Sequence, residues 1–329
     1  MNSSDVKFQH ESVMIDEITE VFATVPHGVV LDATLGGAGH SLKLLQTYSW
    51  IRILGIDRDP LAIANAETVA TLHPEIGDRL VARHGRFDQL PRIMESIHLT
   101  EISGALFDLG VSSPQFDRPE RGFSYRHDGP LDMRMDPTAR LSAANVVNDY
   151  DTERLTRVIR EYSDERFAFR VANAIVAHRP ISSTTQLAEI VSAAIPAPAR
   201  RTGGHPAKRT FQAIRIEVNN ELDMLPDALD AAIDATTSGG RIAVLTYHSG
   251  EDRIVKRVFR DAEVDPLVEN IATPFVHPLQ SSYKRVRPVR VNETPSASEI
   301  ARNPRSSSAR LRVIQKSSMP KSSATTAGH

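Results

Sequence analysis

The sequence predicts an α/β fold in which a parallel sheet is interrupted by a helical insertion. Up to residue 108, short apolar runs alternate with segments of helical periodicity, which is the pattern of right-handed βαβ units. The alternation then stops, and a long stretch shows helical periodicity alone. Apolar runs return at residues 241–245 and 310–314, so the simplest account is one sheet domain that contains an insertion.

Periodicity and punctuation define the elements of the first part. Apolar residues at helical spacing predict a helix over residues 12–25. Asp59 and Pro60 predict a helix start, because the acid can cap the helix and the proline suits its first turn. The predicted strands are residues 29–33, 51–56, 80–82 and 104–108, and the other predicted helices are residues 40–47 and 88–97.

The middle of the chain has a different character. Gly, Pro, Ser and Asp are frequent in residues 109–137, which predicts a long loop, and such loops are often functional. Residues 142–194 show only helical periodicity, and residues 196–209 predict a basic flexible connector before a helix near 211–235. We expect a sheet domain formed by 1–134 and 206–315, an insertion at 135–205, and a disordered tail at 316–329.

Composition excludes several classes of chemistry. The 329 residues include no cysteine, which rules out disulfides, thiol catalysis and cysteine-ligated zinc, and we expect no metal. The N-terminus lacks the pattern of a signal peptide, and no run approaches the length of a membrane span, so we expect a cytoplasmic protein without a membrane partner. Residues 121–215 carry 15 Lys and Arg against 10 Asp and Glu, which suggests a polyanionic partner or, alternatively, a solvated surface.

A glycine-rich turn indicates a nucleoside-bearing cofactor. The predicted first strand ends in Asp32 and is followed by glycines at 36, 37 and 39, and the second strand ends in Asp57. Glycines let a ligand approach the backbone, and the second acid can hold ribose hydroxyls. The third glycine of a dinucleotide fingerprint and the lysine of a phosphate-binding loop are both missing, so the pattern favours S-adenosylmethionine. The alternative is an ordinary tight turn.

Asp108 ends another predicted strand and should lie at the same edge of the sheet, facing the predicted cofactor. Residues 109–115 resemble the Ser/Asp/Asn-Pro-Pro-aromatic loop of methylases that act on exocyclic amines. Such an amine is a poor nucleophile, because its lone pair is delocalised into the ring. Oxygen atoms that accept its N–H bonds would aim it at a methyl sulfonium. The candidate catalytic residues are therefore Asp108, Ser113 and Pro114.

Several longer motifs carry a specific family resemblance. They are HESV at 10–13, LFDLGVSSPQ at 106–115, ERGFS at 120–124, DGPLDMRMD at 128–136, RTFQAIR at 209–215, HS at 248–249, EDR at 251–253, NPR at 303–305 and SARLR at 308–312. With these motifs, the chain resembles the RsmH (MraW) family of bacterial 16S rRNA cytidine N4-methyltransferases over residues 8–315. The resemblance implies a seven-stranded, Rossmann-like class I methyltransferase sheet with an inserted all-helical domain.

The resemblance also implies an activity and a partner. The reaction is in-line methyl transfer from S-adenosylmethionine to N4 of a flipped-out cytidine in the decoding centre of 16S rRNA. The partner is 16S rRNA, within the small ribosomal subunit, and both a monomer and a homodimer stay open. The residues alone leave three alternatives: a small-molecule methyltransferase, a nucleotide-cofactor dehydrogenase and a non-catalytic RNA-binding module.

Site residues are carried over by motif. The expected cofactor contacts are Ala38, Gly39, His40, Asp57, Phe87, Asp108 and Gln115. The expected substrate contacts are Phe123 and Tyr125 as stacking rings, Arg200, Arg201, Lys208 and Arg209 as phosphate contacts, and His248. Each class has a structural alternative: a core position for Phe87, a helix-start residue for His40, loop anchors for the two other rings, a solvated connector for the cations and a helix cap for His248. Gly250 stands where the family usually has leucine, which leaves the loop geometry there open.

Overall fold

The computed structural model describes residues 12–200, 204–263 and 285–317, and every structural statement below refers to these residues. They contain a seven-stranded sheet of order β3-β2-β1-β4-β5-β7-β6, in which β7 runs antiparallel to both of its neighbours and the other pairs are parallel. The strands are β1 (Gly28–Asp32), β2 (Ile51–Asp57), β3 (Leu80–His84), β4 (Ile102–Asp108), β5 (Thr236–Thr246), β6 (Val286–Pro288) and β7 (Arg310–Lys316). The predicted sheet fold is confirmed.

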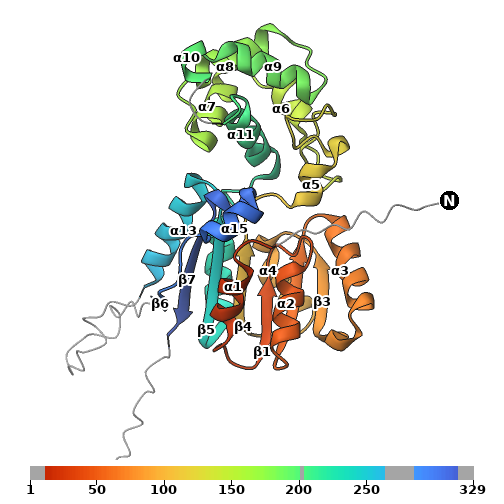
Figure 1. The fold of residues 1–329 in the computed structure, drawn as a ribbon, viewed down its shortest axis with the longest axis vertical. Helices are drawn as coiled ribbons and strands as arrows, with labels where there is room; N and C mark the ends of the chain where they lie inside the picture. Colours follow the sequence, from red (N-terminus) through yellow and green to blue (C-terminus); the bar gives the residue numbers. More distant parts are fainter. Residues whose placement is uncertain (1–11, 201–203, 264–284, 318–329) are drawn as a thin grey trace, which may run out of the picture.

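Helices bury both faces of this sheet (Figure 1). Val30 and Leu31, neighbours in β1, belong to two separate apolar clusters, because successive side chains of a strand point to opposite faces. The first cluster includes side chains of α1 (Ile15–Phe22) and α2 (Gly39–Thr47), and the second includes side chains of α4 (Leu90–Ser96), α12 (Leu225–Ala235) and α13 (Ser249–Ala262). Helix α3 (Pro60–Leu72) packs beside β3, and α15 (Ala297–Arg302) lies near the N-terminal segment.

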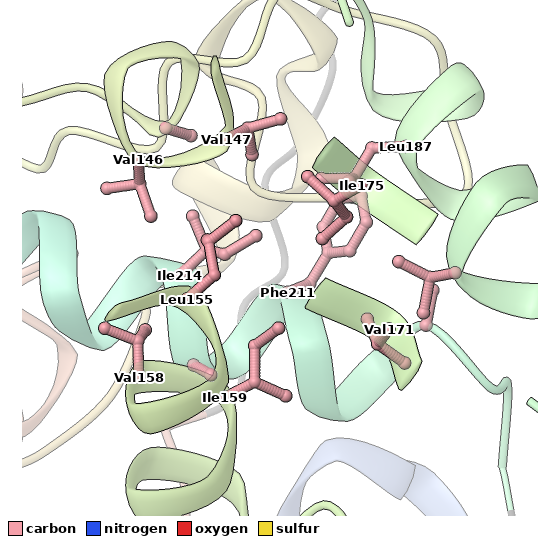
Figure 2. Close-up of a cluster of buried hydrophobic side chains, with 14 of the residues drawn as sticks. Val146, Val147, Leu155, Val158, Ile159, Val171, Ile175, Leu187, Phe211 and Ile214 are labelled. Carbon is pink, nitrogen blue, oxygen red and sulfur yellow. The ribbon is translucent and has the colours of Figure 1, made fainter. Parts of the chain in front are cut away.

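The insertion is a separate helical body with its own core. Its helices are α6 (Ala143–Asp149), α7 (Thr152–Ser163), α8 (Ala168–Ala177), α9 (Thr184–Ala194), α10 (Ala197–Arg200) and α11 (Lys208–Asn219). Ser142, Asp151 and Ser183 cap three of them by accepting a backbone N–H three residues later. Leu155 and Ile159 of α7 meet Ile214 and Phe211 of α11 in the centre of the core (Figure 2).

This core extends beyond the predicted limits of the insertion at both ends. Phe123 and Leu131 belong to it although they precede residue 135, and Phe211 and Ile214 belong to it although they follow residue 205. Local composition marks loops, whereas long-range packing decides which body a loop joins.

Three further expectations need correction. The predicted helix over 211–235 is two helices, α11 and α12, because Asn220 adopts a left-handed backbone (φ 50°) that ends α11. The predicted connector is partly helical, since α10 lies within it and Lys208 and Arg209 begin α11. The predicted tail starts too early, because Lys316 is still paired in β7, while residues 318–329 lie outside the described part of the chain. Strand β6, which spans only three residues, is too short to show a period and was not predicted.

None of the described helices is both long enough and apolar enough to cross a bilayer.

Gly122 lies where the chain first passes from the sheet domain into the insertion. Its φ is +69°, and a Cβ atom there would lie 2.1 Å from the carbonyl oxygen of Pro130. Only glycine allows this approach of two backbone segments.

The insertion core generates a stability prediction. We expect Ile214→Ala to lower the free energy of unfolding by about 2–5 kcal/mol, because Ile214 is fully buried and the cavity cannot fill completely. Leu72→Ala is the control, since Leu72 is 70% exposed, and it should change stability by less than about 0.5 kcal/mol. Urea unfolding measures both values. Equal losses for the two variants would contradict this account of the core.

Candidate active site

Three acids lie where neighbouring parallel strands end. Asp32, Asp57 and Asp108 are the last residues of β1, β2 and β4. The carboxyl ends of adjacent parallel strands meet at one edge of a sheet, which is where open α/β sheets bind ligands. This edge faces the helical insertion (Figure 1).

Asp32 holds the glycine turn between β1 and α2 in place through hydrogen bonds to residues on both sides of the turn. Its carboxylate is buried and accepts hydrogen bonds from the Ser41 hydroxyl at 2.6 Å and from the Thr34 N–H at 3.3 Å. Burial raises the pKa of Asp32. The turn needs left-handed backbone at Gly36 (φ +48°) and at Ala38 (φ 58°), the residue before α2. A Cβ atom at Gly37 would meet nothing within 4 Å, so the turn borders open space.

Asp57 has the chemistry expected of a ribose ligand. One carboxylate oxygen accepts the N–H of Gly36 at 2.8 Å, and the other accepts the N–H of Asp59 at 2.8 Å. Each oxygen can accept a second bond, so two acceptor positions remain for two hydroxyl donors. Burial raises the pKa of Asp57 to about 6, and the group is therefore ionised at neutral pH. The residues present fit a nucleoside.

Phe87 and Gln115, two of the predicted cofactor contacts, are both buried and contact other side chains of the site. The Phe87 ring is buried, packs edge-to-face on Phe107 with centroids 5.8 Å apart, and lies 5.8 Å from the Arg58 guanidinium carbon. The Gln115 side chain is buried too, where its oxygen accepts the N–H of Ser112 and its amide nitrogen donates to Asp59 at 3.0 Å. Gln115 therefore fastens the loop after β4 to the strand end of β2.

Ser113 and Pro114 begin the short helix α5 (Ser113–Asp117), and their side chains lie outside the described part of the structure. They therefore stay predicted catalytic residues. They follow Ser112 directly, and the carbonyl of Ser112 accepts the N–H bonds of Gln115 and Phe116 at the start of α5.

Asp108 is the centre of a three-residue cluster. One carboxylate oxygen accepts the hydroxyl of Tyr247 at 2.6 Å, and the other lies 3.4 Å from Nε2 of His40. Its own N–H donates to the Thr34 hydroxyl at 2.7 Å. His40 is buried, and no hydrogen-bond partner of its ring exists among the described residues. The Asp108 side chain is 25% exposed, so the carboxylate is partly accessible to solvent.

Tyr247 is a site residue that the sequence reasoning missed. Burial and the charge of Asp108 raise its pKa well above the usual value, so the hydroxyl stays protonated and donates. The available signal was its position at the end of a strand that neighbours β4. Asp59 and Arg121 were missed as well, and they form an ion pair of 2.9 Å between β2 and the insertion.

The predicted substrate residues up to the start of α11 include two aromatic rings, which pack against the insertion, and a set of cations, of which the described ones are exposed. Phe123 is 3% exposed in the insertion core, so the loop-anchor alternative is correct and the predicted stacking role is wrong. Tyr125 stacks on His205 with centroids 4.5 Å apart and meets Phe211 edge-to-face. Arg200, Lys208 and Arg209 are exposed, with Arg209 3.7 Å from Glu165, and Arg201 lies outside the described residues.

His248 caps α13, because Nδ1 accepts the N–H of Glu251 at 3.4 Å and Nε2 lies 3.2 Å from the Glu251 carboxylate. The helix-cap alternative is therefore the one observed. Gly250 lies in the first turn of this helix, where a Cβ atom would be 3.1 Å from Nδ1 of His248. A larger side chain there would require a small shift of the imidazole. Among the described residues, no group of three or more His, Asp and Glu could hold a metal ion.

The strand order, the antiparallel β7, the glycine turn and the acid that ends β2 define a class I S-adenosylmethionine-dependent methyltransferase. The sequence profile of the MraW methylase family matches residues 7–317. The chain belongs to this family, and the predicted resemblance is confirmed.

Curated relatives agree. The chain is 45% identical over 317 residues to "Ribosomal RNA small subunit methyltransferase H" of Thermobifida fusca, which covers 94% of both chains. It is 46% identical over 328 residues to the protein of the same name from Mycolicibacterium smegmatis, covering 95% of this chain and 86% of the relative. A solved rRNA methylase from Streptococcus thermophilus superposes with a TM-score of 0.40 at 10% identity, over 92% of this chain and 94% of that one. The fold assignment rests on the strand order.

The cluster around Asp108 predicts a role for the Tyr247 hydroxyl. We expect Tyr247→Phe to slow methyl transfer roughly tenfold, which is the rate equivalent of one hydrogen bond to a charged group. Tyr48→Phe is the matched control, since the Tyr48 hydroxyl donates to a carbonyl of α1 at 2.8 Å, away from this cluster. Single-turnover rates of both variants test the prediction. A Tyr247→Phe enzyme as fast as Tyr48→Phe would show that Asp108 needs no such partner.

Proposed function

We propose that this protein transfers the methyl group of S-adenosylmethionine to the exocyclic N4 amine of a cytidine in the decoding centre of 16S rRNA. The observation that carries the proposal is the fixed, partly exposed carboxylate of Asp108, beside the glycine turn and directly before the loop that resembles the exocyclic-amine methylases. The name of the curated relatives supports small-subunit rRNA as the acceptor. The motifs shared with the RsmH family support N4 and the decoding centre.

The residues around the glycine turn would hold the cofactor. When bound, S-adenosylmethionine would supply an electrophilic methyl group, and its sulfur would keep the electron pair of the broken bond to that methyl group and leave as a thioether. Asp57 would accept both ribose hydroxyls through the acceptor positions left free by Gly36 and Asp59. Ala38, Gly39 and His40 would border the cofactor at the start of α2, and the ring of Phe87 would lie against adenine. Gln115 would contribute by holding the loop in place.

Asp108 would orient the acceptor amine. A carboxylate oxygen that accepts an N–H bond draws the amine out of conjugation with the ring and directs its lone pair. Tyr247 fixes the opposite oxygen, so the carboxylate cannot rotate away. The nitrogen loses a proton when the new N–C bond forms, and Asp108 would accept it. Ser113 and Pro114, in the loop that follows Asp108, stay the other proposed catalytic residues for the flipped-out base.

The insertion would bind the RNA backbone. Arg200, Lys208 and Arg209 are exposed on one stretch between α10 and α11, and Arg201 belongs to the same stretch of sequence. Cations of this kind bind phosphates without reading the base sequence. Tyr125 would support this stretch from within, since its ring stacks on His205. His248, which caps α13 through its contact with Glu251, would border the base. We propose 16S rRNA within the small ribosomal subunit as the partner, in the cytoplasm.

Mapping of methyl groups tests the acceptor. Small subunits from cells that lack the protein, incubated with the enzyme and labelled cofactor, should gain one N4-methylcytidine in 16S rRNA, detected by mass spectrometry of nuclease fragments. Asp108→Ala should abolish the product while RNA binding persists. Methylation of a metabolite with no labelled rRNA would favour a small-molecule methyltransferase instead.

Charge removal tests the RNA contacts. We expect the triple alanine variant at Arg200, Lys208 and Arg209 to bind RNA more weakly, with the slope of log affinity against log salt reduced by about one for each lost phosphate contact. The control removes three exposed arginines of the sheet domain, Arg52, Arg92 and Arg260, and should keep the wild-type slope. Equal slopes in the two variants would contradict a phosphate-binding role for the insertion.

The raised pKa of Asp57 predicts how cofactor affinity depends on pH. The carboxylate accepts hydroxyls only when ionised, so affinity should be constant above about pH 6 and fall towards tenfold per pH unit below it. Calorimetric titration with S-adenosylhomocysteine between pH 5 and pH 8 measures this. Asp57→Asn should bind more weakly at pH 8 and lose the change near pH 6. A change near pH 6 that persists in this variant would assign the titration to another group.

A further inference from the structure

The chain crosses between the two bodies at two places. On the way in, Arg121 precedes Phe123, which already lies in the insertion core. On the way out, Asn219 follows Val218 of that core and precedes Met224, which packs under the sheet. The side chains of Arg121 and Asn219 are both largely buried, with exposed fractions of 12% and 7%. Two polar residues thus mark the two crossings.

Residues 133–135 tie the two crossings to each other. Arg121 donates to the carbonyls of Arg134 and Met135, each at 3.0 Å, and its own carbonyl accepts the N–H of Met133. From the other crossing, the Asn219 amide donates to the carbonyl of Met133 at 2.8 Å and accepts the N–H of Met135 at 2.7 Å. Met133 is fully buried with a left-handed backbone (φ 57°), a conformation that persists only where the surroundings enforce it.

The strand end of β2 is fastened to both crossings. Asp59 forms the 2.9 Å ion pair with Arg121, and Arg58 donates to the carbonyl of Asn219 at 2.6 Å. The same segment contains Asp57, whose carboxylate accepts the N–H of Asp59. One three-residue segment therefore contains the proposed ribose ligand and holds both entrances to the insertion. We call residues 57–59, 121, 133–135 and 219 the bracket.

We propose that Arg121 and Arg58 are positioning residues, which set the place of the helical insertion, and of the RNA that it binds, relative to the cofactor held at Asp57. The inference rests on the proposed function for its substrate. Methyl transfer needs the amine in line with the methyl group, and a misplacement of about 1 Å can slow such a reaction on the order of 100-fold. The ion pair and the carbonyl contacts are short, buried and satisfied on both sides, so they fix one arrangement of the two bodies.

Arg121→Ala tests this role against a matched arginine. We expect its single-turnover rate, at saturating RNA and cofactor, to fall roughly 10- to 100-fold while both affinities stay within about threefold, because binding is intact and alignment is lost. Arg79→Ala is the control. Arg79 also donates to three backbone carbonyls, those of Leu45, Tyr48 and Ile51, but all of them belong to the sheet domain. Its rate should stay near wild type.

Arg121→Lys refines the test and replaces the alanine variant if that protein does not fold. Lysine keeps a charge for Asp59 but lacks the planar fork that reaches two carbonyls as well, so its rate should lie between those of wild type and Arg121→Ala. Hydrogen exchange gives a readout that needs no substrate. Amides of residues 131–136 and 216–222 should exchange faster in Arg121→Ala than in Arg79→Ala, with and without S-adenosylhomocysteine.

Two results would overturn the proposal: equal rate losses in Arg121→Ala and Arg79→Ala, or unchanged exchange at residues 131–136 and 216–222 in Arg121→Ala. These results are distinct from a failure of the proposed function. If the wild-type enzyme methylates no position of 16S rRNA, the acceptor is wrong, and the exchange experiment still decides whether the bracket holds the two bodies in place.

Discussion

The carboxylate of Asp59 is the interaction on which the site and the insertion both depend. It caps α3 through the N–H of Leu61, accepts a hydrogen bond from Gln115 and forms an ion pair with Arg121. The backbone N–H of Asp59 donates to the carboxylate of Asp57. A helix start, the proposed ribose ligand, the loop after β4 and the entrance to the insertion therefore share one buried acid. A buried charge is costly unless it is paired and hydrogen-bonded, so the Asp59 carboxylate depends on its three partners, the Leu61 N–H and the side chains of Gln115 and Arg121.

The free-energy cost of burying the Asp59 carboxylate explains why the residues that contact it are polar rather than apolar. Removing one member of a buried ion pair typically costs about 3–5 kcal/mol, since the other charge stays behind without a partner. An apolar contact of equal area would tolerate sliding, whereas charged hydrogen bonds hold only over a narrow range of distance and angle. The helical body has a complete core of its own, so what it needs from the sheet domain is a fixed position. The directional hydrogen bonds and the ion pair at the crossings fix that position.

The sequence predicts the sheet and the acids at its edge well, because both depend on local patterns. Asp57 and Asp108 could be placed at this edge of the sheet, because parallel strands bring their carboxyl ends together. Tyr247 and Arg121 could not, because their partners are far away in the chain; Tyr247 and Asp108 are 139 residues apart. Phe123 illustrates the opposite difficulty. A ring in a glycine-rich loop suits stacking and anchoring equally, and only its packing against the insertion core decides between them.

The position of the insertion in the chain has a mechanistic consequence. Asp108 ends β4, Gln115 fastens the loop that follows, and Arg121 lies at the crossing into the helical body. The segment that would orient the amine is thus the same segment that carries the chain into the helical insertion. Gln115 and Arg121 both lie on this segment, and both contact the Asp59 carboxylate. In the proposed reaction, the position of the substrate and the position of the insertion would therefore depend on the same carboxylate, two residues beyond the end of β2.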